Sequence, residues 1–358
     1  MNRWFLPSIL LILGSISFVF IHSLLPQLAI KHLIGISLGL LTFFFISHIS
    51  ISRIFNHPWR VYLFTCFLLI IPLILPMKIR GTSRWIPIAG TFRLQPSQLA
   101  FVLIGVSLSQ LIKKITADDK NTTRVSLKLL GLTVVPTILI AIEPDLGTAV
   151  FFFFCMSILC FVSGIPWKHI FFLLGIGVLF SYFSWLYLLQ PYQRQRVTTF
   201  LQPDEASLNE TYNVRQSLIA IGAGGVTGSG IGKGSQSQLR FLPEKHTDFV
   251  FAAFSEEFGF IGSAMLVILY LLICLFLLKE TYGIDSNERQ YFVLFVATYI
   301  FFQSMINIST NTGLLPVTGM TLPFFSYGGT SFVTFGLALG IAQNCILQQK
   351  RFPFLHIV

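Results

Sequence analysis

Ten stretches of almost continuous hydrophobic residues run along the chain, separated by shorter polar segments. A transmembrane helix needs roughly 20 consecutive apolar residues to cross a hydrocarbon core of about 30 Å. The stretches lack the regular alternation of apolar and polar positions that a membrane β-barrel requires. The pattern therefore predicts ten membrane-spanning helices, at residues 5–25, 30–50, 61–77, 98–115, 125–142, 146–163, 169–189, 249–278, 290–308 and 329–347.

The predicted fold class is all-α: a polytopic integral membrane protein, forming a single domain over residues 1–358. A large extracytoplasmic loop at 190–248 separates spans 7 and 8. The run at 249–278 contains Glu256 and Glu257, and its roughly 30 residues would form a helix of about 45 Å. We therefore expect its first third to stand outside the membrane or to line a wet cavity. The first run lacks a small-residue cleavage site and is expected to be a retained span.

Composition agrees with a membrane protein. Hydrophobic residues make up 54% of the chain and charged residues 11%, fewer than half the roughly 25% of an average soluble domain. A soluble globular enzyme and a disordered chain are both excluded as starting assumptions. The net charge of +10 would suggest nucleic acid in a soluble protein. In a membrane protein it reflects positively charged loops, so we expect no nucleic-acid partner.

The five cysteines lie in apolar segments and form no CxxC pair. They are expected to be small buried side chains rather than disulfides or metal ligands.

Lys and Arg residues indicate how the chain is oriented. With both termini in the cytoplasm, every inner segment carries a positive charge, as the positive-inside rule expects. Nearly all of the outer charges fall in two loops, 78–97 and 190–247. The second loop is long enough to escape the rule, but the first is short and breaks it. Either its cations have a function on the outer face, or its Arg side chains extend to lipid headgroups.

The short outer loop reads KIRGTSRWIPIAGTFRLQPS. It mixes Arg, Gly, Trp and Pro without an apolar period, which predicts an ordered loop rather than a helix. Arg80 and Arg84 could bind a phosphate or pyrophosphate through their planar guanidinium groups. Trp85 could stack on a sugar or anchor the loop at the membrane surface.

A second polar segment, AIEPDLGTA, places Glu143 and Asp145 between two apolar runs. Carboxylates at this depth are costly unless they face a cavity or a partner. Pro144 breaks the helix, and Asp145 could cap the helix that follows. A capping role does not exclude a position on a cavity.

The glycine-rich stretch GAGGVTGSGIGKGSQ does not fit a nucleotide-binding P-loop. Thr227 stands where the first glycine is needed, and Gly234 stands where Ser or Thr is needed. We predict instead a tight outer turn with Lys233 at its tip.

The segment QLRFLPEKHTDFVF places Asp248 where water meets the membrane, just before a helix predicted from about Phe249. Two roles are open for Asp248. It could be the N-cap of that helix, or a general base that the neighbouring Lys245 and His246 keep ionised. No Ser–His pair or His cluster supports a covalent nucleophile or a structural zinc site.

The last loop, NTGLLPVTGMTLPFFSYGGTSF, carries no charge. Its Pro and Gly residues predict a re-entrant hairpin packed inside the protein, where irregular backbone is tolerated at membrane depth.

Four separated motifs occur in a characteristic order: GTSRWIPI, EPDLGTA, FLPEKHTDFVFAAFSEEFGFIG and LPFFSYGGTS. They resemble the SEDS family (FtsW, RodA, SpoVE) of polytopic bacterial peptidoglycan glycosyltransferases, over about residues 80–350. Within the family the short N-terminus, PYQRQRVTTFLQP and GSQSQLRFLPE look most like RodA, the elongation member. One departure is visible. Gln98 and Phe101 replace a Glu and a Lys that the family commonly carries, so a cavity ion pair is absent as a pair.

The resemblance implies a polymerase of lipid II, a disaccharide-pentapeptide on undecaprenyl pyrophosphate, at the outer face of the bacterial inner membrane during cell elongation and shape maintenance. It assigns the catalytic aspartate to Asp248 and implies a class B penicillin-binding protein as partner. A divalent cation, Mg²⁺ or Mn²⁺, at the pyrophosphate is left open, and no protein-held metal site is expected. The expected substrate-binding residues are Arg80, Arg84, Trp85, Asp145, Arg194, Arg196, Lys233, Glu244, Lys245 and His246.

Two other functions stay open: a flippase for a lipid-linked substrate, and a non-catalytic scaffold of the cell-wall synthesis complex. The position of Asp248 at the membrane boundary favours the enzyme, because a flippase would place its charges nearer the middle of the bilayer.

Overall fold

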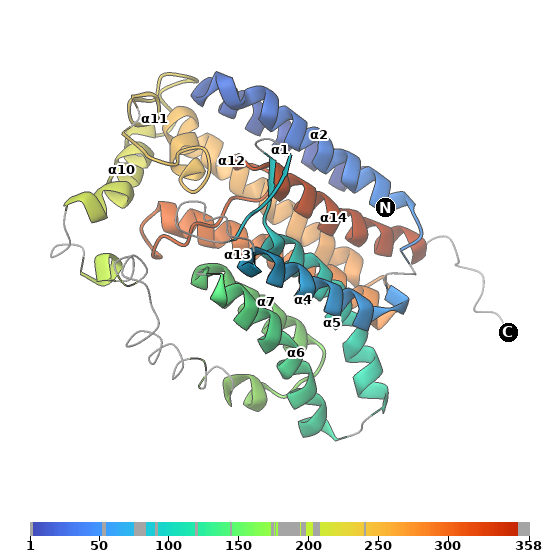
Figure 1. Ribbon diagram of the computed structural model, residues 1–358. Coiled ribbons are helices and arrows are strands. Elements are labelled where there is room, and N and C mark those ends of the chain that lie inside the picture. Colours follow the sequence, from blue (N-terminus) through green and yellow to red (C-terminus); the bar gives the residue numbers. More distant parts are fainter. Residues whose placement is uncertain are drawn as a thin grey trace.

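The computed structural model describes residues 3–51, 55–74, 84–89, 92–118, 121–143, 145–172, 198–202, 208–239 and 241–349, together with residues 175, 177 and 194. The described chain forms a bundle of helices, with a short β-hairpin lying across one end (Figure 1). Its elements are α1 (Phe5–Leu24), α2 (Pro26–His48), α4 (Pro58–Ile74), β1 (Ile86–Ala89), β2 (Phe92–Leu94), α5 (Pro96–Asp118), α6 (Thr122–Ile142), α7 (Leu146–Val162), α10 (Leu208–Gly224), α11 (Ser235–Gln238), α12 (Val250–Thr281), α13 (Asn287–Asn311) and α14 (Gly329–Gln349).

The helices coincide with the hydrophobic runs. Seven of the described helices are long and apolar enough to cross a membrane: α1, α2, α5, α6, α12, α13 and α14. Two shorter apolar helices, α4 and α7, match the spans predicted at 61–77 and 146–163. The polytopic all-α prediction is therefore confirmed. Most of the span predicted at 169–189 lies outside the described residues, so the number of ten spans stays a prediction. Of the loop at 190–248, residues 190–193, 195–197, 203–207 and 240 lie outside them.

The long apolar run at 249–278 forms a helix with a kink. In α12, Gly259 has a φ of +67°, a conformation that glycine adopts without strain. A Cβ at Gly259 would lie 2.3 Å from Gly228 N, so no side chain fits there. Beyond the kink about 22 residues remain, or about 33 Å of helix, which is enough for one crossing. The part before the kink packs against α10 and α11.

The two carboxylates before the kink are buried and hold the glycine-rich loop. Glu256 accepts hydrogen bonds from the backbone N–H groups of Gln236 (2.7 Å) and Ser237 (2.8 Å), and so caps α11. Glu257 accepts a hydrogen bond from Ser23 Oγ of α1 (2.8 Å). These two carboxylates therefore accept hydrogen bonds from groups of the protein and do not line a water-filled cavity.

Helices α2 and α14 form the most extensive helix pair. Gly39 and Gly336 face each other in their interface, and a Cβ added at Gly336 would lie 2.2 Å from Gly39 O. Small residues at such positions let membrane helices approach closely.

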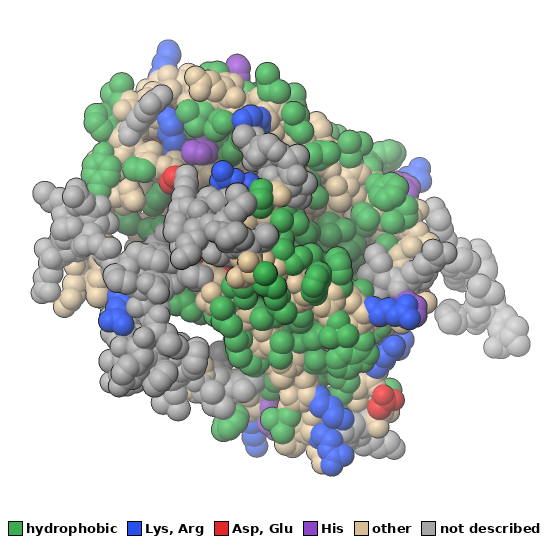
Figure 2. Space-filling model, viewed as in Figure 1, with side chains coloured by type: hydrophobic (Ala, Val, Ile, Leu, Met, Phe, Trp, Pro, Cys, Tyr) green, Lys and Arg blue, Asp and Glu red, His purple; other side chains and the backbone are tan. Residues whose placement is uncertain are grey.

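Phenylalanine fills the seams between the helices and also covers the outside. Phe20 contacts Phe254 and Phe325, with ring centroids 5.3 Å and 5.9 Å apart. By contrast, Phe45 and Phe67 are exposed by 67% and 60%. Figure 2 shows hydrophobic side chains covering much of the middle of the visible face, as a lipid-facing surface requires.

The first and the last described residues lie at the same end of the bundle. Gln343 Nε2 in α14 donates to Arg3 O, just before α1 (3.2 Å). At the other end of α1, Gln238 Nε2 in α11 donates to Ser23 O (3.2 Å). The start of α1 and the end of α14 therefore lie opposite α10 and α11 (Figure 1).

This arrangement gives a topology prediction. A reporter fused at Gly234, next to α11, is expected to be external, and one fused at Thr122, at the start of α6, is expected to be cytoplasmic. Paired alkaline phosphatase and green fluorescent protein fusions measure the side directly. The same side for both positions would contradict the topology.

Candidate active site

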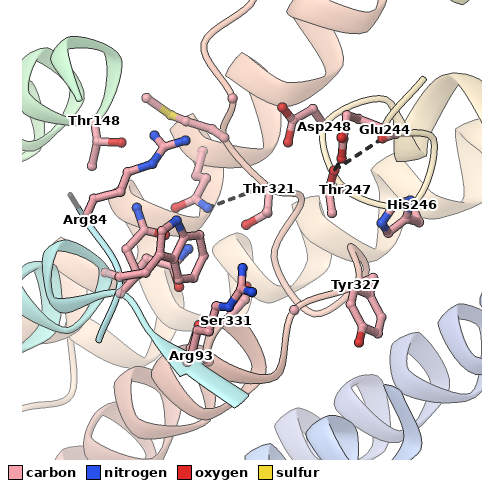
Figure 3. A pocket seen from close by; sticks show the side chains of 18 of the residues that line it. Arg84, Arg93, Thr148, Glu244, His246, Thr247, Asp248, Thr321, Tyr327 and Ser331 are labelled. Carbon is pink, nitrogen blue, oxygen red and sulfur yellow. Dashed lines mark hydrogen bonds between the residues drawn. The ribbon is translucent and has the colours of Figure 1, made fainter. Parts of the chain in front are cut away.

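A cavity of about 450 Å³ lies at the end of the bundle that carries the β-hairpin. Its lining comes from the hairpin, the first turns of α2, α5 and α7, the second half of α13, residues 244–248 and residues 319–331. Figure 3 shows side chains from these separate segments surrounding one space.

Asp248 lines this cavity, and its main chain is tightly held. Two side chains of α13 donate to Asp248 O: Asn311 Nδ2 (2.9 Å) and Asn307 Nδ2 (3.1 Å). Asn307 Nδ2 also donates to Met320 O (2.7 Å), which ties the same point to the last loop. The N-cap of α12 is Phe249, without a side-chain capping hydrogen bond. The structure therefore does not use Asp248 as the N-cap of α12.

The last loop supports residues 244–248 from the other side. Tyr327 N donates to His246 O (2.8 Å), and Ser326 Oγ donates to Thr247 O (2.8 Å). Thr247 Oγ1 donates to Glu244 Oε2 (3.2 Å; Figure 3). Residues 322–326 are buried and irregular, which agrees with the prediction that this uncharged loop packs within the protein.

Among the described residues, three cations line the cavity: Lys31, Arg84 and Arg93. Arg84 Nη1 lies 3.0 Å from Asp145 Oδ2, so its charge is compensated. Within the described part of the chain, neither Lys31 nor Arg93 has an acidic side chain within salt-bridge distance. These two residues, from α2 and β2, therefore bring to the cavity two positive charges that no salt bridge among the described residues neutralises.

Asp145 caps the helix that follows it and pairs with a residue of the cavity. Its Oδ1 accepts a hydrogen bond from Thr148 N (3.4 Å) as the N-cap of α7, while Oδ2 pairs with Arg84. Asp145 is only 4% exposed and is not among the lining residues. Its contribution to the cavity is to orient Arg84.

Glu143 lies two residues before Asp145 and is fully buried, with 0% exposure. Neither of its carboxyl oxygens has a hydrogen-bond partner within the described residues. Burial, with an added contribution from the Asp145 charge, raises the pKa of Glu143 to about 9, and the nearby Arg84 only partly opposes this. The carboxyl group is therefore protonated at neutral pH.

The structure brings part of the expected site together. Trp85, Glu244 and His246 line the cavity with Arg84 and Asp248. These five residues come from two sequence motifs more than 150 positions apart, so their meeting in one cavity is a finding of the structure.

Other expected contacts lie elsewhere. Lys245 is buried, and its Nζ donates to Ser237 O, so it supports the glycine-rich loop. Lys233 is exposed on the glycine-rich turn, and neither it nor the half-buried Arg194 is among the lining residues. Arg80 and Arg196 lie outside the described residues.

Sequence reasoning missed several lining residues. Lys31 was an isolated charge at the start of a span, and Arg93 was only one of several charges in its loop. The uncharged lining residues gave no signal of their own, since single Gln, Thr and Ser residues are common in membrane helices. They include Gln95, Gln303, Thr321, Thr330 and Ser331.

Within the described residues, no three His, Cys, Asp or Glu side chains gather as a metal site. Two carboxylates, Asp248 and Glu244, line the cavity. Mg²⁺ commonly binds one or two carboxylates together with substrate phosphates rather than a full protein cage. This donor set fits a cation that arrives with a pyrophosphate.

The fold and the cavity define a polytopic membrane protein with a site, at one end of the helix bundle, that combines carboxylates with cations. The FtsW/RodA/SpoVE family model, described as cell cycle protein, matches residues 4–351. The chain therefore belongs to this family, the SEDS family.

Relatives and a solved structure agree with this membership. The chain is 35% identical to the probable peptidoglycan glycosyltransferase FtsW of Wigglesworthia glossinidia brevipalpis, over 92% of this chain and 86% of that protein. It is also 35% identical to the peptidoglycan glycosyltransferase MrdB of Escherichia coli K12, over 76% of this chain and 72% of that protein. A solved chain from a peptidoglycan synthase complex is 27% identical, with a TM-score of 0.79 over 97% of this chain and 98% of that chain.

The position within the family is less sharply defined. FtsW and MrdB, the RodA counterpart, share the same 35% identity with this chain. A specific similarity to RodA, and with it the role in elongation, stays a prediction.

Proposed function

We propose that this chain is a peptidoglycan glycosyltransferase that polymerises lipid II into glycan strands, with Asp248 as the general base. One observation carries the proposal: Asp248 lines the same cavity as the cations Lys31, Arg84 and Arg93. Family membership supports it, because the relatives FtsW and MrdB are named as peptidoglycan glycosyltransferases.

In the proposed reaction the 4-hydroxyl of the acceptor sugar attacks the anomeric carbon of the donor. Asp248 takes the hydroxyl proton as the new C–O bond forms. The bond between the anomeric carbon and the pyrophosphate oxygen breaks, and its electron pair leaves with undecaprenyl pyrophosphate. Because the leaving group departs from the face opposite to the attack, an α-linked donor gives a β-linked polymer without a covalent sugar–enzyme intermediate.

The cations have a separate task, which is to bind the pyrophosphate and stabilise the charge that develops as it leaves. Lys31 and Arg93 suit this task because neither has an acidic partner among the described residues. Arg84, oriented by Asp145, adds a planar group that can bind phosphate oxygens in a bidentate manner. A Mg²⁺ or Mn²⁺ ion held by Glu244 would supply further neutralisation of the phosphates.

The chain is a multi-pass membrane protein. We propose the bacterial inner membrane as its location, with both termini in the cytoplasm and the cavity facing outward. We also propose a class B penicillin-binding protein as its partner, docked through a transmembrane helix and an outer domain. The similarity to a chain of a peptidoglycan synthase complex supports such an assembly.

The test of the proposed function is polymerisation of lipid II by the protein purified in detergent, alone and with the partner. Glycan chains separated by electrophoresis are the expected product, and the partner alone is the control. A flippase would give no polymer but would move the lipid across vesicle membranes. A scaffold would do neither, and either result would overturn the enzymatic proposal.

A further inference from the structure

His32 is a buried ionisable residue within α2, and the proposed reaction gives it no task. It is 2% exposed, and it directly follows Lys31, which lines the cavity. Ionisable residues inside membrane-spanning helices are rare, and by default they point to a function that involves an identifiable partner. The partners of His32 therefore indicate what it does.

Two hydrogen bonds connect His32 to the last loop. Ser17 Oγ of α1 donates to Phe325 O (2.7 Å), and His32 Nε2 lies 2.7 Å from the same hydroxyl oxygen. A hydroxyl group has one hydrogen to donate, and a carbonyl oxygen can only accept. His32 Nε2 is therefore the donor to Ser17 Oγ, and the two bonds run in one direction from α2 through α1 to the last loop.

The last loop carries this connection on to the segment that holds Asp248. Ser326 Oγ donates to Thr247 O (2.8 Å), and Tyr327 N donates to His246 O (2.8 Å). Both acceptors lie within two residues of Asp248. A continuous path of hydrogen bonds and backbone therefore links a residue buried in α2 to the proposed general base.

The turn in the middle of this path has an unusual backbone. Phe324 has a φ of +55°, which is an outlier for a bulky side chain and persists only where the surroundings hold it. Two side chains hold the turn from outside: Ser17 donates to Phe325 O, and Tyr270 OH of α12 donates to Pro323 O. Without the Ser17 contact the turn would still be retained by Tyr270. We therefore expect a local displacement of the turn rather than unfolding.

Ring contacts fix the orientation of the imidazole. It stacks on Tyr327, with ring centroids 5.9 Å apart and an interplanar angle of 30°, and Phe332 of α14 meets it edge-on at 5.2 Å. The Tyr327 ring in turn lies 5.6 Å from the ring of His246. Figure 3 shows Tyr327 beside His246, directed toward the pale blue helices of the N-terminal part of the chain. The imidazole is thereby held where its Nε2 reaches Ser17.

We propose that His32 is a positioning residue for Asp248, acting through Ser17 and the last loop. His32 is not among the residues that line the cavity. Its Nε2–H group fixes the Ser17 hydroxyl, which fixes the turn that supports residues 246–247. The carboxylate of Asp248 is then held in the geometry that proton transfer from the acceptor hydroxyl requires. The inference rests on the proposed function, since it takes Asp248 as the general base.

Two substitutions of His32 isolate its hydrogen bond. His32→Leu removes the donor, whereas His32→Gln places an N–H donor the same number of bonds from the backbone, and both lose the ring. In lipid II polymerisation, His32→Leu is expected to lower kcat about ten- to a hundredfold, because a small misplacement of a catalytic group can cost that much. KM should stay within about twofold, since no substrate contact is removed. His32→Gln should recover most of kcat, and equal losses in the two variants would overturn the proposal.

Ser17→Ala gives a second measurement that does not depend on His32→Leu folding. It should lower kcat by a similar factor, and the double variant should lose no more than the more affected single variant, because both changes break one path. Ser47→Ala is the matched control: Ser47 is also buried, but its hydroxyl bonds within α2, to Phe44 O and His48. The control should keep kcat. Equal losses in Ser17→Ala and Ser47→Ala, or additive losses in the double variant, would refute the path.

Hydrogen–deuterium exchange of the full chain tests the path without any polymer. In His32→Leu and Ser17→Ala, exchange should become faster in peptides covering residues 244–250 and 322–328, because the bond from Tyr327 N to His246 O opens more often. Peptides from α6 should exchange as in the wild type, and faster exchange there as well would mean a general loss of stability and reject the proposal.

The same two measurements separate this inference from the proposed function. Faster exchange confined to the two segments, with no polymer from the wild type, would retain the path and reject the glycosyltransferase. Polymer formation by the wild type, with unchanged exchange and unchanged kcat in the variants, would retain the glycosyltransferase and reject the path.

Discussion

Asp248→Asn is expected to fold, to bind lipid II and to lose nearly all polymerisation. A positioned general base contributes roughly 10²–10⁴-fold in rate, and Asn keeps the shape of Asp without its basicity. The fold should survive because Asn307 and Asn311 bind the backbone carbonyl of residue 248, which the substitution leaves intact. Capping is also unaffected, since Phe249 is the N-cap of α12.

Initial rates of glycan chain formation, together with lipid II binding and thermal unfolding, measure the three expectations separately. Asp285→Asn makes the same chemical change at an exposed site between α12 and α13 and should keep full activity. Glu244→Gln tests the other carboxylate of the cavity and should retain more activity than Asp248→Asn. Near-normal glycan chains from Asp248→Asn would eliminate its catalytic role, and loss in Glu244→Gln alone would transfer that role to Glu244.

Most of the helical fold could be predicted from hydrophobic runs, because the bilayer fixes both the length and the apolar character of a spanning helix. The kink in α12 could not. Gly259 is one glycine among 27 in the chain, and its left-handed conformation follows from the backbone of residues 226–228 packed against it. The β-hairpin at residues 86–94 was predicted only as an ordered loop, since its strands have three and four residues and no clear alternation.

Site residues could be predicted where a polar or aromatic residue beside a predicted span also lies at the cavity. Asp248, Arg84 and Trp85 were singled out as polar or aromatic residues beside predicted spans, and all three line the cavity. Side-chain direction within an irregular segment was not predictable. Lys245 and His246 are adjacent in sequence, but Lys245 turns to the glycine-rich loop whereas His246 lines the cavity. Glu244, just before them, has a φ of +48°, so neither helix nor strand periodicity applies.

Glu143→Gln is expected to raise the thermal stability of the protein at pH 8, and to raise it much less at pH 5. Folding moves Glu143 from water, where its ordinary pKa is 4.5, to a buried position where its pKa is about 9. Between these values the folded state holds a proton that the unfolded state has released. The stability of the wild type therefore falls as pH rises from about 4.5 to about 9.

At pH 7, 2.5 units above the ordinary pKa of 4.5, this penalty reaches about 3.5 kcal/mol as an upper estimate, at about 1.4 kcal/mol for each pH unit. Gln has no proton to gain or lose, so the variant lacks the penalty. The neighbouring pair of Arg84 and Asp145 is unchanged in the variant, and its own pH dependence cancels in the comparison.

Apparent unfolding temperatures of the wild type and of Glu143→Gln in the same detergent, measured from pH 5 to pH 8.5, test this expectation. The difference between the two proteins should be small at pH 5 and grow to several degrees at pH 8.5. Glu280→Gln, at a half-exposed carboxylate near the end of α12, controls for the substitution itself. If the Glu143 carboxylate were instead ionised and stabilised by the Arg84 charge, Glu143→Gln would be less stable than the wild type at pH 8. That outcome would show that Glu143 is not protonated beside the Arg84–Asp145 pair. Glu143 would then share with Asp145 the task of balancing the charge of Arg84.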